Sequence, residues 1–271
     1  MFAMRTQSAD SPGLTADERP GEFVQSLERG LTVIRCFGPE TPRLTLVEVA
    51  RASGLSRATA RRFLHTLESL GYCATDGRTW FLRPRVLDLG YAYLSSVATW
   101  DVVQDHLQTL VQQTHESSSA SVLDGHDVLY TVRVPTKRIM SMSIEVGTRL
   151  PAFATSMGRV LLAGLNESAF ESYLETASLR TITPRTVRDK ATLREIVADV
   201  RRQGYCLLDQ ELEAGIRSVA APLHDPKGNV FAALNVSSHA SRVTLAELRS
   251  SILPEVRSTA QAVEADLRLR R

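Results

Sequence analysis

Basic side chains recur at helical spacing in one short stretch, at Arg57, Arg61, Arg62 and His65. Arginine suits phosphate oxygens and guanine edges, because its planar guanidinium can donate two parallel hydrogen bonds. With its apolar residues turned to the core, a helix here leaves the basic side chains outward; those apolar residues are Ala60, Phe63, Leu64, Leu67 and Leu70. This pattern favours contact with nucleic acid, although an ordinary helical hairpin with solvated arginines has the same pattern.

Two helical patterns meet around this stretch. The first, with Leu46, Val49 and Ala50 on one face, runs out at Ser53-Gly54, where glycine can adopt the positive φ that ends a helix. Ser56 can cap the second helix. Helix-turn-helix proteins insert the start of their second helix into the DNA major groove.

A further helix and a hairpin flank the two helices. The helix begins near Val24 and ends by Gly38-Pro39, with Leu27, Leu31 and Ile34 on its apolar face. After the second helix, Asp76-Gly77 can form the turn between two short strands, 72–75 and 79–82. Together these elements predict a winged helix-turn-helix domain.

The predicted domain spans residues 22–83 and is basic. From Phe23 to Arg85, ten arginines face five acidic residues, whereas the whole chain has a formal net charge of only +2. Such asymmetry suggests a nucleic-acid module joined to a different domain. The residues predicted to contact double-stranded operator DNA are Thr45, Ser56, Arg57, Ala58, Thr59, Arg61, Arg62, His65 and Arg78.

The bulk composition limits the class of protein. With 271 residues, 43% hydrophobic and 23% charged, the chain is long enough for two globular domains. Its three cysteines are widely spaced without a CxxC pair, so we expect reduced thiols, no metal and no cofactor. The apolar runs are far shorter than the ~20 residues that span a bilayer, which predicts a cytoplasmic protein without a membrane partner. Residues 1–21 are expected to form a disordered tail.

The remaining chain predicts a linker and an α+β domain. Pro84 suits the start of a linking helix over 84–100, and 101–271 contains strand patterns, then helices, then strands and a closing helix. The expected order is a helix over 101–114, a meander over 117–123, 128–134 and 138–144, helices over 156–164, 167–175 and 189–203, strands over 205–208, 217–224 and 230–237, and a helix from Thr244. The predicted sheet is central and antiparallel.

Polar residues on otherwise apolar elements indicate a small-molecule site. Asn235 and Ser237 share one face of the last strand, and Ser218 lies on the strand before it. Thr155-Ser156 opens a helix whose free N–H groups could bind a carboxylate. Each residue alone could instead cap a helix or face solvent.

Two arginines and three acidic residues are further candidates. Arg133 and Arg138 flank Pro135-Thr136, and either could bind a carboxylate or lie on the surface. Asp209, Glu211 and Glu213 are expected in a loop too flexible to act as an acid/base pair. Since the histidines are scattered and no GxSxG, HExxH or P-loop motif occurs, we predict that the protein is not an enzyme.

Four segments resemble the IclR family of bacterial transcriptional regulators: SLERGLTVIRCFG at 26–38, LTLVEVARASGLSRATARRFLHTLESLGY at 44–72, LPAFATSMGRVLLA at 150–163 and GYCLLDQELEAGIRSVAAPLHDPKGNVFAALNVS at 204–237. The resemblance implies a GAF-like effector domain and a homodimer or dimer of dimers. RIMSMSIEVGTRLPAFATSMGRVLLA at 138–163 is most similar to the subgroup for the β-ketoadipate pathway, which covers protocatechuate and 4-hydroxybenzoate.

The resemblance also implies an effector pocket. It implies that the effector contacts Ile139, Met142, Ser156, Met157, Leu208, Ile216, Ser218, Asn235 and Ser237. We add Arg138 to this predicted effector-binding set as a candidate carboxylate ligand. A glyoxylate- and pyruvate-binding family member has an aspartate at the position of Leu208, with Asp209 beside it here. Leucine in place of an acid favours a larger and less polar effector, such as an aromatic acid or a dicarboxylate.

The predicted function is therefore a DNA-binding regulator of aromatic acid catabolism that responds to a small organic acid. The alternatives are an IclR-type regulator for a short keto acid such as glyoxylate or pyruvate, a small enzyme, and an architectural DNA-binding protein. Neither the operator, the sign of regulation nor the effector follows from the sequence.

Overall fold

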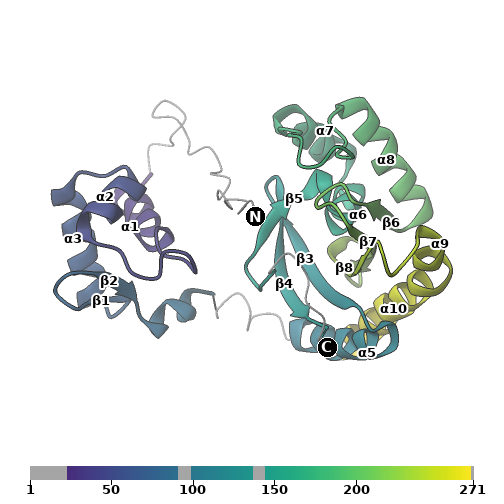
Figure 1. Ribbon diagram of the computed structural model, residues 1–271, viewed down its shortest axis with the longest axis horizontal. Helices are drawn as coiled ribbons and strands as arrows, with labels where there is room; N and C mark the ends of the chain where they lie inside the picture. Colours follow the sequence, from purple (N-terminus) through teal and green to yellow (C-terminus); the bar gives the residue numbers. More distant parts are fainter. Residues whose placement is uncertain (1–22, 91–98, 137–143, 270–271) are drawn as a thin grey trace. The chain divides into compact units, whose positions relative to one another are not determined.

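The computed structural model describes residues 23–90, 99–136 and 144–269 (Figure 1). These residues form two compact units, one made of 23–90 and the other of the two later ranges. The predicted tail at 1–21 lies outside the described residues, as do Arg138, Ile139 and Met142.

The N-terminal unit has the predicted winged helix-turn-helix order. Its elements are α1 (Gln25–Arg35), α2 (Leu46–Ser53), α3 (Arg57–Ser69), β1 (Cys73–Thr75) and β2 (Trp80–Leu82). Gly54 ends α2 with φ 67°, as its position in the sequence predicts. β1 and β2 pair antiparallel with Cys73 opposite Leu82, which makes the wing.

One small core holds this unit together. Val33 of α1, Val49 of α2 and Leu64 of α3 are fully buried in it. Trp80 of the wing is also buried, and its backbone exchanges hydrogen bonds of 2.7 and 3.0 Å with Leu44, just before α2. The wing is therefore attached to the helices by both backbone pairing and apolar packing.

Three leucines of the predicted apolar faces are more exposed than expected. Leu27 and Leu31 are 62% and 46% exposed, because α1 packs on the unit through Val33 on a different side. Leu70 is 51% exposed; it is the cap residue that follows α3, which ends at Ser69. The helices form where the sequence predicts them, but these three leucines lie at the surface.

The C-terminal unit is built on one six-stranded antiparallel sheet. Its order is β5-β4-β3-β8-β7-β6, so that β3 and β8, distant in sequence, are central neighbours. The strands are β3 (Ser117–Asp124), β4 (Asp127–Val134), β5 (Arg149–Pro151), β6 (Cys206–Asp209), β7 (Ile216–His224) and β8 (Val230–His239).

Helices cover both faces of this sheet (Figure 1). They are α5 (Thr99–Thr114), α6 (Ser156–Gly164), α7 (Glu167–Thr176), α8 (Lys190–Gln203), α9 (Leu245–Glu247), the five-residue π-helix η4 (Leu248–Ile252) and α10 (Leu253–Leu269). α5 and α10 pack on each other and on one face, while α6 packs on β3, β6, β7 and β8 from the other. This arrangement confirms the predicted α+β class with a central antiparallel sheet.

Two predicted elements lie partly outside the described residues. The third strand was expected at 138–144, of which only Ile144 is described; within the described part, β5 (Arg149–Pro151) pairs with β4. The linking helix was expected over 84–100. The 3-10 turn η2 (Pro84–Val86) begins that segment and is followed by helical residues at 87–90. α5 starts at Thr99, so Trp100 is a buried residue of the C-terminal unit. Residues 91–98 and 137–143 lie outside the described ranges.

Gly158, in the first turn of α6, has no room for a side chain. A Cβ atom there would lie 2.2 Å from the carbonyl oxygen of Ala152, which is backbone and cannot rotate away. We expect Gly158→Ala to lower the free energy of unfolding by about 1–3 kcal/mol or more, as overpacking does. Thermal unfolding should show this loss. Gly30→Ala is the control, since its Cβ would make ordinary contacts of 3.8 Å with Phe63, and an equal loss in both variants would contradict the assignment.

Candidate functional site

The recognition helix α3 exposes the predicted basic face. Arg57, Arg61 and Arg62 are all exposed on it, together with Ala58. Ser56 caps the helix: its hydroxyl accepts a hydrogen bond of 3.2 Å from the N–H of Thr59. The start of α3 therefore presents cations and free N–H groups, the combination that binds phosphate.

Thr45 and His65 have structural partners within the unit. Thr45 caps α2 in a reciprocal capping box with Glu48. His65 lies edge-on to the ring of Trp80, with centroids 5.2 Å apart, and its Nδ1 is 3.2 Å from Glu68. Both residues stay at the surface, and His65 also joins the recognition helix to the wing.

The tip of the wing is ordered by Asp76. Its Oδ1 accepts hydrogen bonds from the backbone N–H groups of Arg78 and Thr79, and its Oδ2 accepts one of 2.8 Å from Arg43. These hydrogen bonds, led by that from Thr79, hold the pKa of the Asp76 carboxyl well below its usual value. The Arg78 side chain is exposed at this tip, where a wing can reach DNA.

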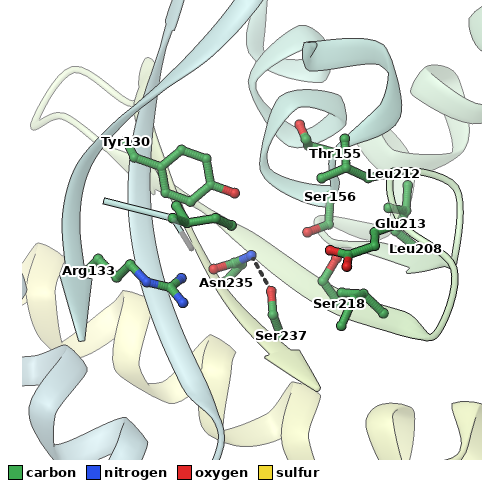
Figure 2. Close-up of a pocket in the computed structure, with 12 residues that line it drawn as sticks. Tyr130, Arg133, Thr155, Ser156, Leu208, Leu212, Glu213, Ser218, Asn235 and Ser237 are labelled. Atoms are coloured by element: carbon green, nitrogen blue, oxygen red, sulfur yellow. Dashed lines mark hydrogen bonds between the residues drawn. The ribbon is translucent and has the colours of Figure 1, made fainter. Parts of the chain in front are cut away.

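The C-terminal unit contains a pocket between the sheet and α6 (Figure 2). About 510 Å³ of space free of atoms, open solvent included, lies within and in front of it. Its walls combine apolar, hydroxyl, amide and charged side chains. The lining residues are Tyr130, Arg133, Ile144, Thr155, Ser156, Leu208, Leu212, Glu213, Ile216, Ser218, Asn235 and Ser237.

A β-bulge directs two residues of β4 into the pocket. Ala120 of β3 pairs with Val132, whereas Ser121 pairs with Tyr130, so Thr131 is an extra residue on β4. Because side chains alternate along a regular strand, residues 130 and 133 would otherwise point to opposite faces. The bulge places Tyr130 and Arg133 on the same side.

Burial changes the electrostatics of these two side chains. Arg133 is half-buried, and burial lowers the pKa of its guanidinium from the usual value. Its Nη1 is 3.4 Å from the hydroxyl of Ser119, a weak contact. Burial also raises the pKa of Tyr130 to about 12, so its hydroxyl stays protonated at neutral pH. Arg133 is thus a cation that has lost water and gains from an anionic ligand.

Asn235 and Ser237 form the floor of the pocket on β8. The amide nitrogen of Asn235 donates a hydrogen bond of 3.1 Å to the hydroxyl of Ser237 (Figure 2). Asn235 is only 4% exposed, and its side-chain oxygen has no hydrogen-bond partner among the described residues. An unsatisfied buried acceptor calls for a hydrogen-bond donor, which a bound ligand can supply.

The start of α6 supplies a hydroxyl to the facing wall. Thr155 caps the helix by accepting a hydrogen bond of 3.0 Å from the N–H of Gly158. Ser156 is 1% exposed, and within the described part of the chain its hydroxyl has no partner. This hydroxyl and the first N–H groups of α6 meet at the pocket, as the sequence predicts.

The loop between β6 and β7 is held by a buried ion pair. Arg159 of α6 is 2% exposed and donates to both carboxylate oxygens of Glu211, at 2.7 and 2.5 Å. Its Nε also donates to the carbonyl oxygen of Phe153 at 2.9 Å. Glu211 accepts a further hydrogen bond of 3.1 Å from the N–H of Val187. The expectation that Asp209, Glu211 and Glu213 lie in a flexible loop is therefore wrong.

Other contacts fix the two ends of the same loop. The hydroxyls of Thr183 and Thr186 donate to the carbonyl oxygens of residues 210 and 211, each at 2.7 Å. Asp209 is paired with both Arg185 and Arg217. Asp209 and Glu211 are thus each paired with different arginines, and they do not form an acid/base pair with each other.

Six of the predicted effector-binding residues meet in the pocket. They are Ser156, Leu208, Ile216, Ser218, Asn235 and Ser237. Met157 instead is fully buried in the core, where its sulfur accepts a hydrogen bond of 3.3 Å from Ser121. Arg138, Ile139 and Met142 lie outside the described residues, so their assignment remains a prediction.

Several lining residues were not assigned to the pocket from the sequence. Tyr130, Ile144 and Leu212 look like ordinary core residues in the sequence, and Glu213 looks like a loop acid. Arg133 was considered as a carboxylate ligand but not included in the predicted set. Its position two residues before a proline at a strand end was the available signal.

The described residues hold neither a metal-like cluster of side chains nor a helix that could span a membrane. Among these, no three His, Cys, Asp or Glu side chains gather as they would around a metal ion. None of the helices in this part of the chain combines the length and the apolar character needed to cross a membrane.

A winged helix-turn-helix joined to a domain with a polar, partly enclosed pocket defines a ligand-responsive transcriptional regulator. Sequence comparison identifies the family. The model of the IclR helix-turn-helix domain matches residues 26–77, and that of the bacterial transcriptional regulator IclR C-terminal domain matches residues 91–265. The chain belongs to the IclR family.

Its relatives include regulators of aromatic catabolism. The Pca regulon regulatory protein of Pseudomonas putida is 45% identical over 234 residues, which are 86% of this chain and 80% of that protein. The p-hydroxybenzoate hydroxylase transcriptional activator of Acinetobacter baylyi is 36% identical, over 92% of this chain and 94% of that one. The structure of an IclR homolog of Microbacterium hydrocarbonoxydans, solved with 4-hydroxybenzoate, matches with a TM-score of 0.81 and 25% identity. The match covers 90% of this chain and 99% of that one.

These comparisons confirm the family, the similarity to the β-ketoadipate subgroup and the winged-helix plus α+β fold. The relatives are transcriptional regulators and not enzymes, which agrees with the prediction from the missing catalytic motifs.

Arg61 and Arg62 provide the test of the DNA-binding face. We expect Arg61→Ala and Arg62→Ala each to weaken operator binding about tenfold, the size typical of a lost phosphate or base contact. Gel shifts at fixed salt concentration measure this loss. Arg194→Ala is the control, because Arg194 is an exposed arginine of α8. If both α3 variants bound the operator as tightly as this control, α3 would not be the recognition helix.

The Arg159–Glu211 pair should be essential for stability. Removing one partner leaves a buried charge without compensation, so Glu211→Gln should cost about 3–5 kcal/mol of unfolding free energy. Chemical denaturation measures the change. Glu171→Gln removes one partner of the exposed bidentate pair with Arg194 and should change little, since solvent screens such pairs. Similar losses in the two variants would contradict the role given to burial.

Proposed function

We propose that this protein controls aromatic acid catabolism by binding operator DNA through α3 and the wing, and a small organic acid in the pocket of the C-terminal unit. Support comes from the named relatives and from the chemistry of the pocket. We also propose that it acts in the cytoplasm as a homodimer or a dimer of dimers. A symmetric oligomer suits an operator with two half-sites.

The observation that carries the ligand assignment is the half-buried cation Arg133. Its contact in the described structure is a neutral hydroxyl at 3.4 Å, so the cost of desolvation is poorly offset. A carboxylate beside it would supply the opposite charge and paired hydrogen bonds. Asn235 and Ser156 offer unsatisfied groups to the rest of the ligand.

The shape and polarity of the walls favour a ligand larger than a short keto acid. Leu208, Leu212 and Ile216 give the pocket an apolar side, against which a ring can pack. A two- or three-carbon keto acid would leave this surface uncovered. The alternative of a glyoxylate or pyruvate effector is therefore not favoured.

Ligand binding must change DNA affinity or geometry for regulation to occur. We propose that the segment over 84–100 couples the two units, because it joins them in the chain. The effector must then bind one arrangement of this segment better than another, since equal affinity for both would shift nothing.

Two substitutions test the pocket. We expect Arg133→Met to weaken binding of 4-hydroxybenzoate at least tenfold by removing the cation, and Ser156→Leu to abolish it by filling the space at α6. Isothermal titration calorimetry measures the affinity. Gel shifts should show operator binding unchanged, and Arg194→Met, on the surface of α8, should leave ligand affinity intact. Normal ligand binding by both pocket variants would place the effector elsewhere.

A further inference from the structure

An ionised acid lies at the exposed tip of the wing, next to the basic side chain of Arg78. The side chain of Asp76 is 46% exposed. Hydrogen bonds, led by that from Thr79, hold the pKa of this carboxyl well below its usual value, so it carries a full negative charge at neutral pH. Such a charge repels the phosphates of DNA. A reader of DNA gains nothing from direct contact between this acid and its target.

The Asp76 carboxylate accepts four hydrogen bonds. Its Oδ1 accepts from the backbone N–H groups of Arg78 at 2.9 Å and Thr79 at 2.6 Å. Its Oδ2 accepts from the hydroxyl of Thr79 and from Nη1 of Arg43, both at 2.8 Å. The first three contacts close the turn, and the fourth ties the turn to a residue outside the hairpin.

Arg43 is itself held in place beside the wing. The next residue, Leu44, exchanges backbone hydrogen bonds of 2.7 and 3.0 Å with Trp80. The guanidinium carbon of Arg43 lies 4.2 Å from the centroid of the Phe81 ring, a distance at which a cation is attracted to the aromatic face. Arg43 therefore connects the tip of the wing to the chain just before α2.

The tip needs this support more than the base of the wing does. The base is packed into the core through Trp80, whereas Asp76, Gly77 and Arg78 are exposed. Gly77 has φ 89°, and a Cβ atom there would meet no other atom within 4 Å. A cation on an unsupported loop loses conformational entropy when it binds. Ordering the turn beforehand removes part of this cost.

The charges of Arg43 and Asp76 offset each other, so Arg78 supplies the net positive charge of the tip. Removing the Asp76 carboxylate would raise the net charge of the N-terminal unit by one. Long-range attraction alone would then make the protein bind DNA more tightly. Loss of the ordered tip would have the opposite effect, and the two influences can be told apart by the sign of the change.

We propose that Asp76 is a positioning residue of the DNA interface: together with Arg43 it holds the wing tip so that Arg78 contacts the DNA backbone. The gain from this order exceeds the repulsion between the carboxylate and the phosphates. The inference rests on the proposed function, since it takes the wing as part of the DNA-binding surface.

DNA binding over a range of salt concentrations tests the proposal in the full-length protein. The probe is a labelled duplex that the wild-type protein selects from random-sequence DNA, and fluorescence anisotropy measures the affinity. Arg78→Ala should weaken binding and lower the slope of log K against log salt by about 1, the value for one lost phosphate contact. Asp76→Ala should weaken binding by about fivefold or more and lower the slope by a similar amount.

Glu40→Gln is the charge control. Glu40 is an exposed acid of the same unit, and its substitution also raises the net charge by one. This variant should bind the duplex as tightly as the wild type, or more tightly. If Asp76→Ala did the same, the positioning role would be refuted.

The double variant Asp76→Ala/Arg78→Ala shows whether Asp76 acts through Arg78. Both substitutions should remove the same contact, so the double variant should bind about as weakly as the weaker single variant. Fully additive losses would overturn the proposal. Circular dichroism checks the fold, and should Asp76→Ala unfold, Asp76→Asn takes its place. Asparagine keeps an oxygen for the turn but loses the charge that faces Arg43. It should still weaken binding, and affinity at or above the wild-type value would again refute the proposal.

The two levels of the proposal fail differently. If the variants Arg61→Ala, Arg62→Ala and Arg78→Ala all bind as tightly as the wild type, DNA binds elsewhere and the proposed function fails. If the α3 variants weaken binding but Arg78→Ala does not, the wing tip makes no contact, and the proposal fails while α3 remains the recognition helix. If all three weaken binding but Asp76→Ala does not, the role of Asp76 alone is refuted.

Discussion

The buried ion pair between Arg159 and Glu211 is the interaction on which the pocket depends. Arg159 lies one turn inside α6, and Glu211 lies in the loop that carries Leu212 and Glu213 into the pocket. Burying both charges is costly, and the pair is tolerated because a bidentate contact and hydrogen bonds from or to the backbone satisfy it. One contact thus sets two walls of the pocket relative to each other.

A second constraint acts on the opposite wall, where the sheet itself must be irregular. Arg133 can share the pocket with Tyr130 only because Thr131 is an extra residue in β4. A bulge locally disrupts the ladder of hydrogen bonds, and here it redirects a cation towards the interior. One wall thus depends on irregular strand pairing in β4, and the other depends on the desolvated pair between Arg159 and Glu211.

The sequence predicts local features better than long-range ones. Periodicity and capping residues locate α2, α3 and α6, and alternation along β8 places Asn235 and Ser237 together. The bulge at Thr131 and the ion pair between residues 52 positions apart leave no periodic signal, so the pocket roles of Tyr130 and Glu213 could not be predicted. The exposure of Leu27 and Leu31 was missed for a related reason, since an apolar stripe does not show which part of it meets the core.

Burial gives the same residue type two different functions in this chain. Arg61 and Arg62 are exposed to solvent, so they lose little without an anionic partner and suit a polyanion whose counterions are released on binding. Arg133 is half-buried and has already lost much of its water, so its interaction with a single carboxylate is screened less by salt. An exposed cation of the first kind cannot distinguish one small acid from another. Discrimination requires an enclosed cation together with further polar groups held at fixed places around the ligand.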